Sequence, residues 1–187
     1  MVTTTKIVPQ VIITWPSWSG KTTLLRNLMV KYPASFAKPI QYTTRKARHE
    51  KEFDDYVFLS RDQFMKKLTN WDFIEYIEYN KELYAIGKYF DKNISNVFIV
   101  EPVWREAIQK YFKVNKIPYV SFFLEFDEKE MRYRLEERRE AIKTIEERVK
   151  DLDYFYPSPS CKILDATERE ETLVAKVRTE CEAFWKT

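Results

Sequence analysis

A short apolar segment followed at once by a loop and a helix constrains this chain more than any other feature. Residues 11–15 (VIITW) form a short, mostly apolar run that ends at Pro16, which is typical of a strand buried on both faces of a parallel sheet. Residues 22–32 then carry leucines and a methionine at helical spacing, and Pro33 closes the run. The chain therefore begins with a buried strand, a connecting loop and a helix.

The same alternation returns further along the chain. After the first strand, apolar runs predict strands at residues 40–43, 97–100, 119–126 and 162–164. Segments with apolar residues at helical spacing lie between the later strands, at residues 104–112 and from residue 127 onward. Five strands alternating with helices predict an α/β fold, a five-stranded parallel sheet flanked by helices.

Two segments depart from this alternation. The aromatic-rich residues 56–59, 73–79 and 83–86 predict small antiparallel strands around a helix that starts with a capping box of Ser60 and Gln63. A charge-rich interruption near residues 138–143 predicts a flap in the fourth helical segment. We expect one domain over residues 1–187, with a core at 1–43 and 97–187, an inserted lobe at 44–96 and a lid at about 136–148.

Composition excludes several kinds of partner. The 32 basic residues nearly cancel the 29 acidic ones, so we expect no nucleic-acid face. No apolar stretch approaches the roughly 20 residues that span a bilayer, so we expect no membrane partner. Cys161 and Cys181 are far apart and match no metal spacing, so reduced thiols are expected. These observations predict a cytoplasmic protein, a monomer or a homodimer.

The loop after the first strand, residues 15–22 (WPSWSGKT), resembles a Walker A loop, G-x-x-x-x-G-K-[ST]. Such a loop wraps backbone N–H groups around phosphates, while its lysine reaches the β and γ phosphates and its hydroxyl ligates Mg²⁺. Trp15 and Trp18 stand where glycines are usual, so the motif is imperfect. We expect ATP as phosphoryl donor, with Mg²⁺, bound by Ser17, Trp18, Ser19, Gly20, Lys21, Thr22 and Thr23.

Four segments in the right order resemble the guanylate kinase family, from about residue 11 to residue 167. Besides the loop, residues 43–48 (TTRKAR) are similar to T-T-R-x-P-R, and residues 55–58 (DYVF) are similar to D-Y-x-F. Residues 73–75 (FIE) and then Tyr84 are similar to F-[IL]-E and N-Y-Y-G. The resemblance implies a P-loop NTPase fold with an inserted NMP-binding lobe and a lid. It also implies phosphoryl transfer from ATP to a nucleoside monophosphate.

The resemblance assigns the acceptor phosphate to Arg45, Arg48, Tyr56 and Tyr84. The chemistry agrees, because guanidinium forks and phenol hydroxyls are suitable donors to a phosphate dianion.

The resemblance also supplies arginines for the transferring phosphoryl group, whose charge needs compensation. Residues 134–138 (RLEER) are similar to the start of the family lid, R-L-x-x-R-G, with Arg139 in place of the glycine. The predicted catalytic residues are Lys21, Arg45, Arg134, Arg138 and Arg148. Thr22 is the expected metal ligand, and Glu101 matches a family carboxylate near the metal.

The predicted base pocket departs from the family. Glu75 keeps the carboxylate that reads guanine, but Gln41 and Ile86 replace hydroxyl residues and Val103 replaces an aspartate. A buried polar group that loses its partner costs about 1–3 kcal/mol, so these changes weaken the case for guanine. We expect the acceptor base to be guanine or a different base, such as a modified pyrimidine.

Two other functions compete with the kinase. A catalytically inactive guanylate-kinase-like binding module would tolerate the altered loop, although Lys21 and the acceptor arginines persist. A nucleic-acid motor requires basic grooves that the composition does not support.

Overall fold

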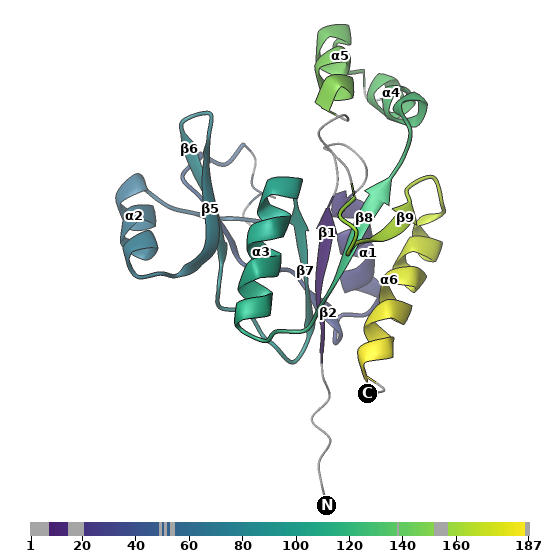
Figure 1. Ribbon diagram of the computed structural model, residues 1–187. Helices are drawn as coiled ribbons and strands as arrows, with labels where there is room; N and C mark the ends of the chain where they lie inside the picture. Colours follow the sequence, from purple (N-terminus) through teal and green to yellow (C-terminus); the bar gives the residue numbers. More distant parts are fainter. Residues whose placement is uncertain are drawn as a thin grey trace, which may run out of the picture.

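A five-stranded sheet forms the centre of the protein (Figure 1). The computed structural model describes residues 8–14, 21–48, 50, 52, 55–137, 139–151 and 157–185. The strand order is β2-β7-β1-β8-β9, and every neighbouring pair is parallel. The strands are β1 (Gln10–Thr14), β2 (Phe36–Ala37), β7 (Ser95–Val100), β8 (Tyr119–Glu125) and β9 (Lys162–Asp165). The predicted α/β fold with its five-stranded parallel sheet is confirmed.

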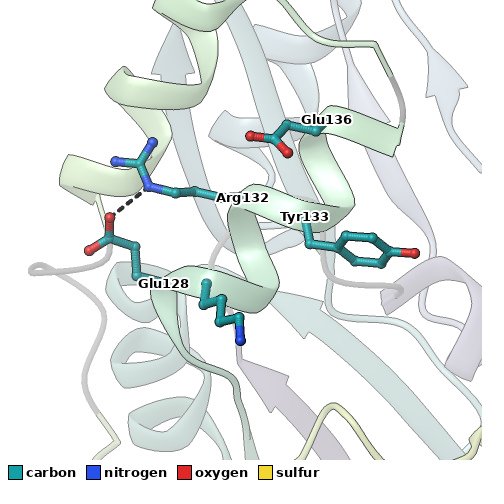
Figure 2. A pocket seen from close by; sticks show the side chains of 5 residues that line it. Glu128, Arg132, Tyr133 and Glu136 are labelled. Atoms are coloured by element: carbon teal, nitrogen blue, oxygen red, sulfur yellow. Dashed lines mark hydrogen bonds and ion pairs between the residues drawn. The ribbon is translucent and has the colours of Figure 1, made fainter.

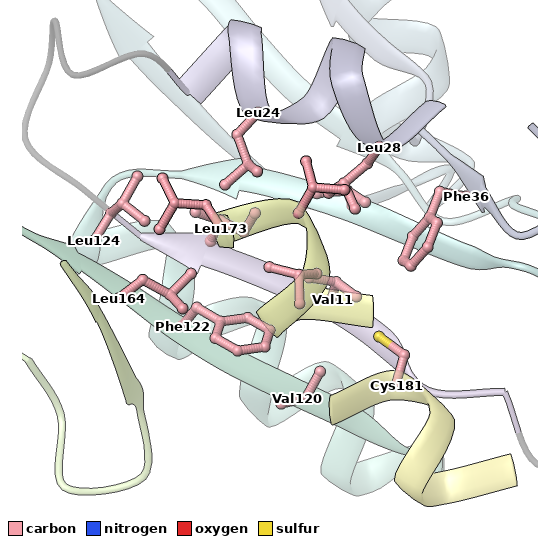
Figure 3. Close-up of a cluster of buried hydrophobic side chains, with 14 of the residues drawn as sticks. Val11, Leu24, Leu28, Phe36, Val120, Phe122, Leu124, Leu164, Leu173 and Cys181 are labelled. Atoms are coloured by element: carbon pink, nitrogen blue, oxygen red, sulfur yellow. The ribbon is translucent and has the colours of Figure 1, made fainter. Parts of the chain in front are cut away.

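Helices cover both faces of this sheet (Figure 1). Side chains of successive strand residues point to opposite faces, so Val11 and Ile13 pack with α1 (Lys21–Lys31) and α6 (Glu170–Trp185), as Figure 3 shows in part. Ile12 faces the other way and packs with Ile108 and Phe112 of α3 (Pro102–Val114). The unbroken apolar run at residues 11–13 of β1 follows from this two-sided burial.

The structure corrects the expected place of the strand at residues 40–43. It forms β3 (Gln41–Thr43), which belongs to a second sheet of order β4-β3-β6-β5, with β4 (Val57–Phe58), β5 (Phe73–Tyr79) and β6 (Glu82–Gly87). The fifth strand of the main sheet is instead β2, whose two residues are too few to carry a periodic pattern. The antiparallel expectation holds for β5 with β6 but not for β4, which runs parallel to β3, and β3 itself pairs antiparallel with β6.

The second sheet has a small core of its own. Ser60 caps α2 (Arg61–Thr69) and forms the predicted capping box with Gln63. Phe64 of α2 is fully buried against Leu83 and Ala85 of β6. This core holds the inserted lobe together. The lobe lies beside α3, and α2 is on the side of the lobe that faces away from α3 (Figure 1).

Two short helices follow β8 in place of one long helix. They are α4 (Glu128–Glu137) and α5 (Ile142–Asp151), which agrees with the predicted interruption. Met131 and Leu135 of α4 pack with Ile145 of α5. Within the residues that the structure describes, no helix has the length and apolar character needed to cross a bilayer.

Candidate functional site

The predicted phosphate loop falls between two described elements, the carboxyl end of β1 and the start of α1. β1 ends at Thr14, which pairs with Val100 at the end of β7, and α1 begins at Lys21. In open parallel sheets this edge is where ligands bind. Ser17, Trp18, Ser19 and Gly20 lie outside the described residues, whereas Thr23 is half-buried on α1.

Lys21 and Thr22 are the first two residues of α1, and only their backbone is described. The backbone N–H groups of the first turn of a helix have no partners within the helix and favour an anion. The strand, loop and helix context that the motif requires is therefore present.

Glu101 lies at the same edge of the sheet, directly after Val100. It is the N-cap residue of α3 and is exposed, and its side chain makes no capping hydrogen bond in the described structure. A carboxylate oxygen beside a hydroxyl such as that of Thr22 is a donor set that suits Mg²⁺. A Mg²⁺ site at Thr22 and Glu101 stays a prediction.

Arg45, which is predicted to bind the acceptor phosphate, follows β3, and two threonine hydroxyls fix the start of its loop. Thr43 Oγ1 accepts a hydrogen bond of 3.1 Å from the Arg45 backbone N–H. Thr44 Oγ1 accepts one of 2.9 Å from the Leu83 backbone N–H and donates one of 2.5 Å to Glu82. The T-T-R sequence thus ties this loop to β6.

Glu52 binds the Arg45 side chain in a two-pronged ion pair. Arg45 Nη1 lies 2.9 Å from Glu52 Oε2, and Arg45 Nη2 lies 3.0 Å from Oε1. The two side chains are only 15% and 12% exposed. The hydrogen bond to the carboxylate raises the pKa of Arg45, so the guanidinium stays charged.

Two predicted tyrosines surround this pair. The Arg45 guanidinium lies 5.7 Å from the centre of the Tyr56 ring and 5.8 Å from that of Phe58. Tyr84 contributes to the raised pKa of Arg45, and its ring lies 6.5 Å from that of Tyr56. Burial raises the pKa of Tyr56, an effect that the nearby Arg45 opposes, so this phenol stays protonated at neutral pH.

Arg48 joins the group through its backbone. Its N–H donates a 2.6 Å hydrogen bond to Glu52 Oε2, while its side chain is exposed. The structure therefore brings Arg45, Tyr56 and Tyr84 together, whereas a phosphate contact by the Arg48 guanidinium stays a prediction. Sequence reasoning missed Glu52, because it is one of several acidic residues in a charged loop and no spacing singles it out.

The predicted base contacts Gln41 and Glu75 flank Ile86 in one row across the second sheet. Ile86 is paired with Gln41 on β3 and with Glu75 on β5. Residues paired across strands present side chains to the same face. Ile86 is fully buried and belongs to the apolar cluster of Phe98 and Val100.

Glu75 is half-buried, and its Oε1 accepts a 2.9 Å hydrogen bond from the Tyr76 backbone N–H. Val103 lies in the first turn of α3, and only its backbone is described.

The lid arginines differ in position. Arg134 on α4 pairs with Glu130 and donates a 2.7 Å hydrogen bond from Nη2 to the Ala166 carbonyl. Arg148 is half-buried on α5, and Arg138 lies outside the described residues. Their roles in catalysis stay predictions.

A surface hollow of about 560 Å³ lies on α4 and is lined by Glu128, Lys129, Arg132, Tyr133 and Glu136 (Figure 2). Arg132 spans α4 and α5 there, pairing with Glu128 and Glu146 at 2.7 Å each. No predicted site residue lines this hollow, so it is separate from the candidate active site.

Comparison with known proteins gives consistent matches. A model of the guanylate kinase family matches residues 8–151. The guanylate kinase of Chlamydia felis (strain Fe/C-56) is 32% identical over 118 residues, which are 60% of this chain and 55% of that protein. The guanylate kinase of Chlamydia abortus (strain DSM 27085 / S26/3) is 32% identical over 137 residues, or 67% of this chain and 63% of that protein. The matches thus span little more than half of these curated relatives.

The fold also matches a solved structure. The crystal structure of guanylate kinase from Anaplasma phagocytophilum superposes with a TM-score of 0.63 at 19% identity, covering 98% of this chain and 89% of that chain. At this identity the similarity establishes the fold.

Proposed function

The chain belongs to the guanylate kinase family, and on that premise we propose that it is a nucleoside monophosphate kinase, which transfers the γ-phosphoryl group of ATP to a ribo- or deoxynucleoside monophosphate. One observation carries the proposal. The Arg45 guanidinium lies against Tyr56 and already binds a planar anion, the Glu52 carboxylate, through two parallel hydrogen bonds. A phosphate offers the same pair of acceptor oxygens.

The donor site is proposed at the loop between β1 and α1. Backbone N–H groups of residues 17–23 would hold the triphosphate, and Lys21 would reach its β and γ phosphates. Thr22 and Glu101 would hold Mg²⁺, which supplies charge neutralisation to the phosphates when it is bound.

The acceptor is proposed to lie in the lobe at residues 44–96, extended by β3. Arg45, Arg48, Tyr56 and Tyr84 would orient its phosphate toward the donor. Arg134, Arg138 and Arg148, in or beside a lid at about residues 136–148, would compensate the charge of the transferring group. Closure of the lobe and lid would exclude water, which otherwise takes the phosphoryl group.

The base is proposed to lie beside Glu75 and Gln41. The carboxylate of Glu75 can accept from the N1–H and amino group of guanine, or from the N3–H of a uracil or thymine ring. Val103 offers no hydrogen bond, and Ile86 is fully buried among apolar side chains, so a base edge that needs a hydroxyl or carboxylate partner at these positions loses about 1–3 kcal/mol per contact. The proposed acceptor is therefore GMP or dGMP, or a nucleotide with another base such as a modified pyrimidine.

A panel of nucleoside monophosphates tests both the proposed kinase activity and the proposed base pocket. ADP release is measured with each ribo- and deoxynucleotide, for the wild-type chain and for Lys21→Ala as the inactive control. Turnover that depends on an acceptor and on Lys21 supports the kinase. Strict preference for GMP or dGMP contradicts the altered pocket, and Gln41→Ser is expected to move preference toward guanine.

A binding module without activity is the second candidate, because Trp15 and Trp18 replace glycines of the phosphate loop. Nucleotide binding with no turnover for any acceptor favours it. Acceptor-dependent turnover excludes it.

We also propose a reducing, cytoplasmic location. Cys161 and Cys181 are free thiols in the structure, which accords with that compartment. Sedimentation would distinguish a monomer from a homodimer.

A further inference from the structure

The Glu52 carboxylate has the surroundings of a bound phosphate. It accepts from Arg45 Nη1 and Nη2 at 2.9 and 3.0 Å and from the Arg48 backbone N–H at 2.6 Å. Both arginines are residues that the family resemblance assigns to the acceptor phosphate. A side chain of the protein therefore already engages the Arg45 guanidinium proposed for the substrate, together with the Arg48 backbone N–H.

The N–H groups of Arg45 that face Glu52 already take part in hydrogen bonds. Nη1 donates to the Lys46 carbonyl at 2.9 Å as well as to Glu52, so both of its hydrogens are engaged. Nη2 uses one of its hydrogens for Glu52. A phosphate that approaches this edge of the guanidinium must take donors that the carboxylate holds.

Charge makes simultaneous occupation unfavourable. A carboxylate and a phosphate dianion within contact distance repel each other, and one guanidinium balances only one of their three negative charges. In the absence of substrate, however, Arg45 is mostly buried and gains from a counter-charge. The two states therefore require an exchange of anions.

We propose, on the basis of the proposed function, that Glu52 is an internal competitor: it holds the Arg45 fork in the free enzyme, and the acceptor's phosphate displaces it. Acceptor affinity is then the difference between two anion complexes of Arg45. A nucleoside without its phosphate has no group to displace Glu52, so Glu52 selects for the phosphorylated acceptor.

Glu52→Gln tests the exchange, because it keeps the shape of the side chain and removes its charge. Binding of inorganic phosphate is measured by calorimetry with the donor loop saturated by ADP. Glu52→Gln is expected to bind phosphate about tenfold more tightly than wild type. The matched control is Glu78→Gln, which removes one negative charge from β5 of the same sheet. It is expected to leave phosphate binding within about twofold of wild type.

A double-mutant cycle assigns the gain to Arg45. In an Arg45→Met background, Glu52→Gln should no longer increase phosphate affinity. A gain that persists without Arg45 contradicts the exchange. Equal or weaker phosphate binding by Glu52→Gln contradicts it too, and weaker binding would make Glu52 a residue that positions Arg45.

A wild-type measurement covers the case in which the variant does not fold. The Arg48 amide loses its Glu52 partner on displacement, so its NMR resonance should move as phosphate is added, with the same dissociation constant as calorimetry. An unmoved Arg48 amide at phosphate saturation overturns the proposal. Failure of the proposed function is a separate result, the absence of phosphoryl transfer to any nucleotide.

Discussion

Arg134 on α4 is hydrogen-bonded to Ala166 just after β9. Its Nη2 donates to the Ala166 carbonyl at 2.7 Å, and the Ala166 N–H donates to the Glu125 carbonyl at the end of β8 at 2.8 Å. The start of the predicted lid is thus connected to the two strands of the main sheet that lie nearest to it. Arg134 has a structural contact in addition to the catalytic role proposed for it.

Replacing Arg134 with methionine should therefore destabilise the protein. The change removes a charge-assisted hydrogen bond and the pair with Glu130, and we expect the free energy of unfolding to fall by about 1–2 kcal/mol. Urea denaturation measures the change. The control is Arg132→Met, whose partners Glu128 and Glu146 are exposed and whose loss should cost less stability than the loss of Arg134. Equal effects of the two variants would contradict a special role for the Ala166 contact.

Gly87→Ala should destabilise the inserted lobe. A Cβ at Gly87 would lie 2.9 Å from Tyr42 Cε2 and 3.3 Å from the Ile40 carbonyl oxygen. The ring must shift and the backbone cannot readily do so, so we expect a loss of about 1–3 kcal/mol. Thermal unfolding measures it. Relief of the loss in Gly87→Ala/Tyr42→Leu would confirm the cause, and an unchanged melting temperature in the single variant would refute it.

The two thiols should differ in reactivity. Cys181 is fully buried, and burial raises its pKa to about 12. Its thiol thus has neither access nor thiolate character at pH 8, whereas Cys161 is half-buried. Mass spectrometry after maleimide treatment should find Cys161 labelled in the folded protein and both cysteines labelled in urea. Equally fast labelling of the two folded thiols would contradict this burial.

The raised pKa of Cys181 makes the free energy of unfolding depend on pH under alkaline conditions. Because the folded pKa of Cys181 lies above the ordinary thiol value of 9.0, the folded state keeps a proton that the unfolded state releases. This contribution is fully present below pH 9 and is lost as pH rises toward about 12. Urea midpoints between pH 8 and pH 11 should fall more steeply for wild type than for Cys181→Ala. Urea midpoints that fall equally with pH in wild type and in Cys181→Ala would contradict this contribution of Cys181.

Removing the Arg45 fork should weaken acceptor use selectively. Arg45→Met is expected to lower kcat/KM for the nucleoside monophosphate by about 30-fold or more, because loss of a buried charge contact costs about 2 kcal/mol or more. The KM for ATP should change little. Steady-state kinetics with each substrate varied separately measures both. Arg61→Met, on α2 of the same lobe, is the control, and an equal effect on both substrates would indicate general unfolding of the lobe.

The sequence predicts the main sheet well where strands are buried on both faces. The apolar runs at residues 11–15 and 97–100 predict the two strands β1 (Gln10–Thr14) and β7 (Ser95–Val100), which are paired within the main sheet. The sequence-based prediction fails for short strands. Phe36 and Ala37 give no periodic signal, and the run at 40–43 does not indicate which sheet it joins, because its partners Ile86, Ala85 and Tyr84 lie far along the chain.

The candidate site can be predicted in part for a similar reason. Arg45, Tyr56 and Tyr84 belong to motifs of fixed spacing, and the structure places them together. Glu52 belongs to no motif, and its pairing with Arg45 depends on how a charged loop folds back. Burial of Ile86 likewise follows from its contact with the main sheet, which a β-strand pattern does not specify.

The most direct test follows the phosphoryl group itself. ATP labelled at the γ-phosphate is incubated with the protein and with each nucleoside monophosphate, and the products are separated by chromatography. We predict a labelled nucleoside diphosphate in equal amount to the ADP formed, and none with Lys21→Ala. Label found only in inorganic phosphate, or in no product with any acceptor, would contradict the account.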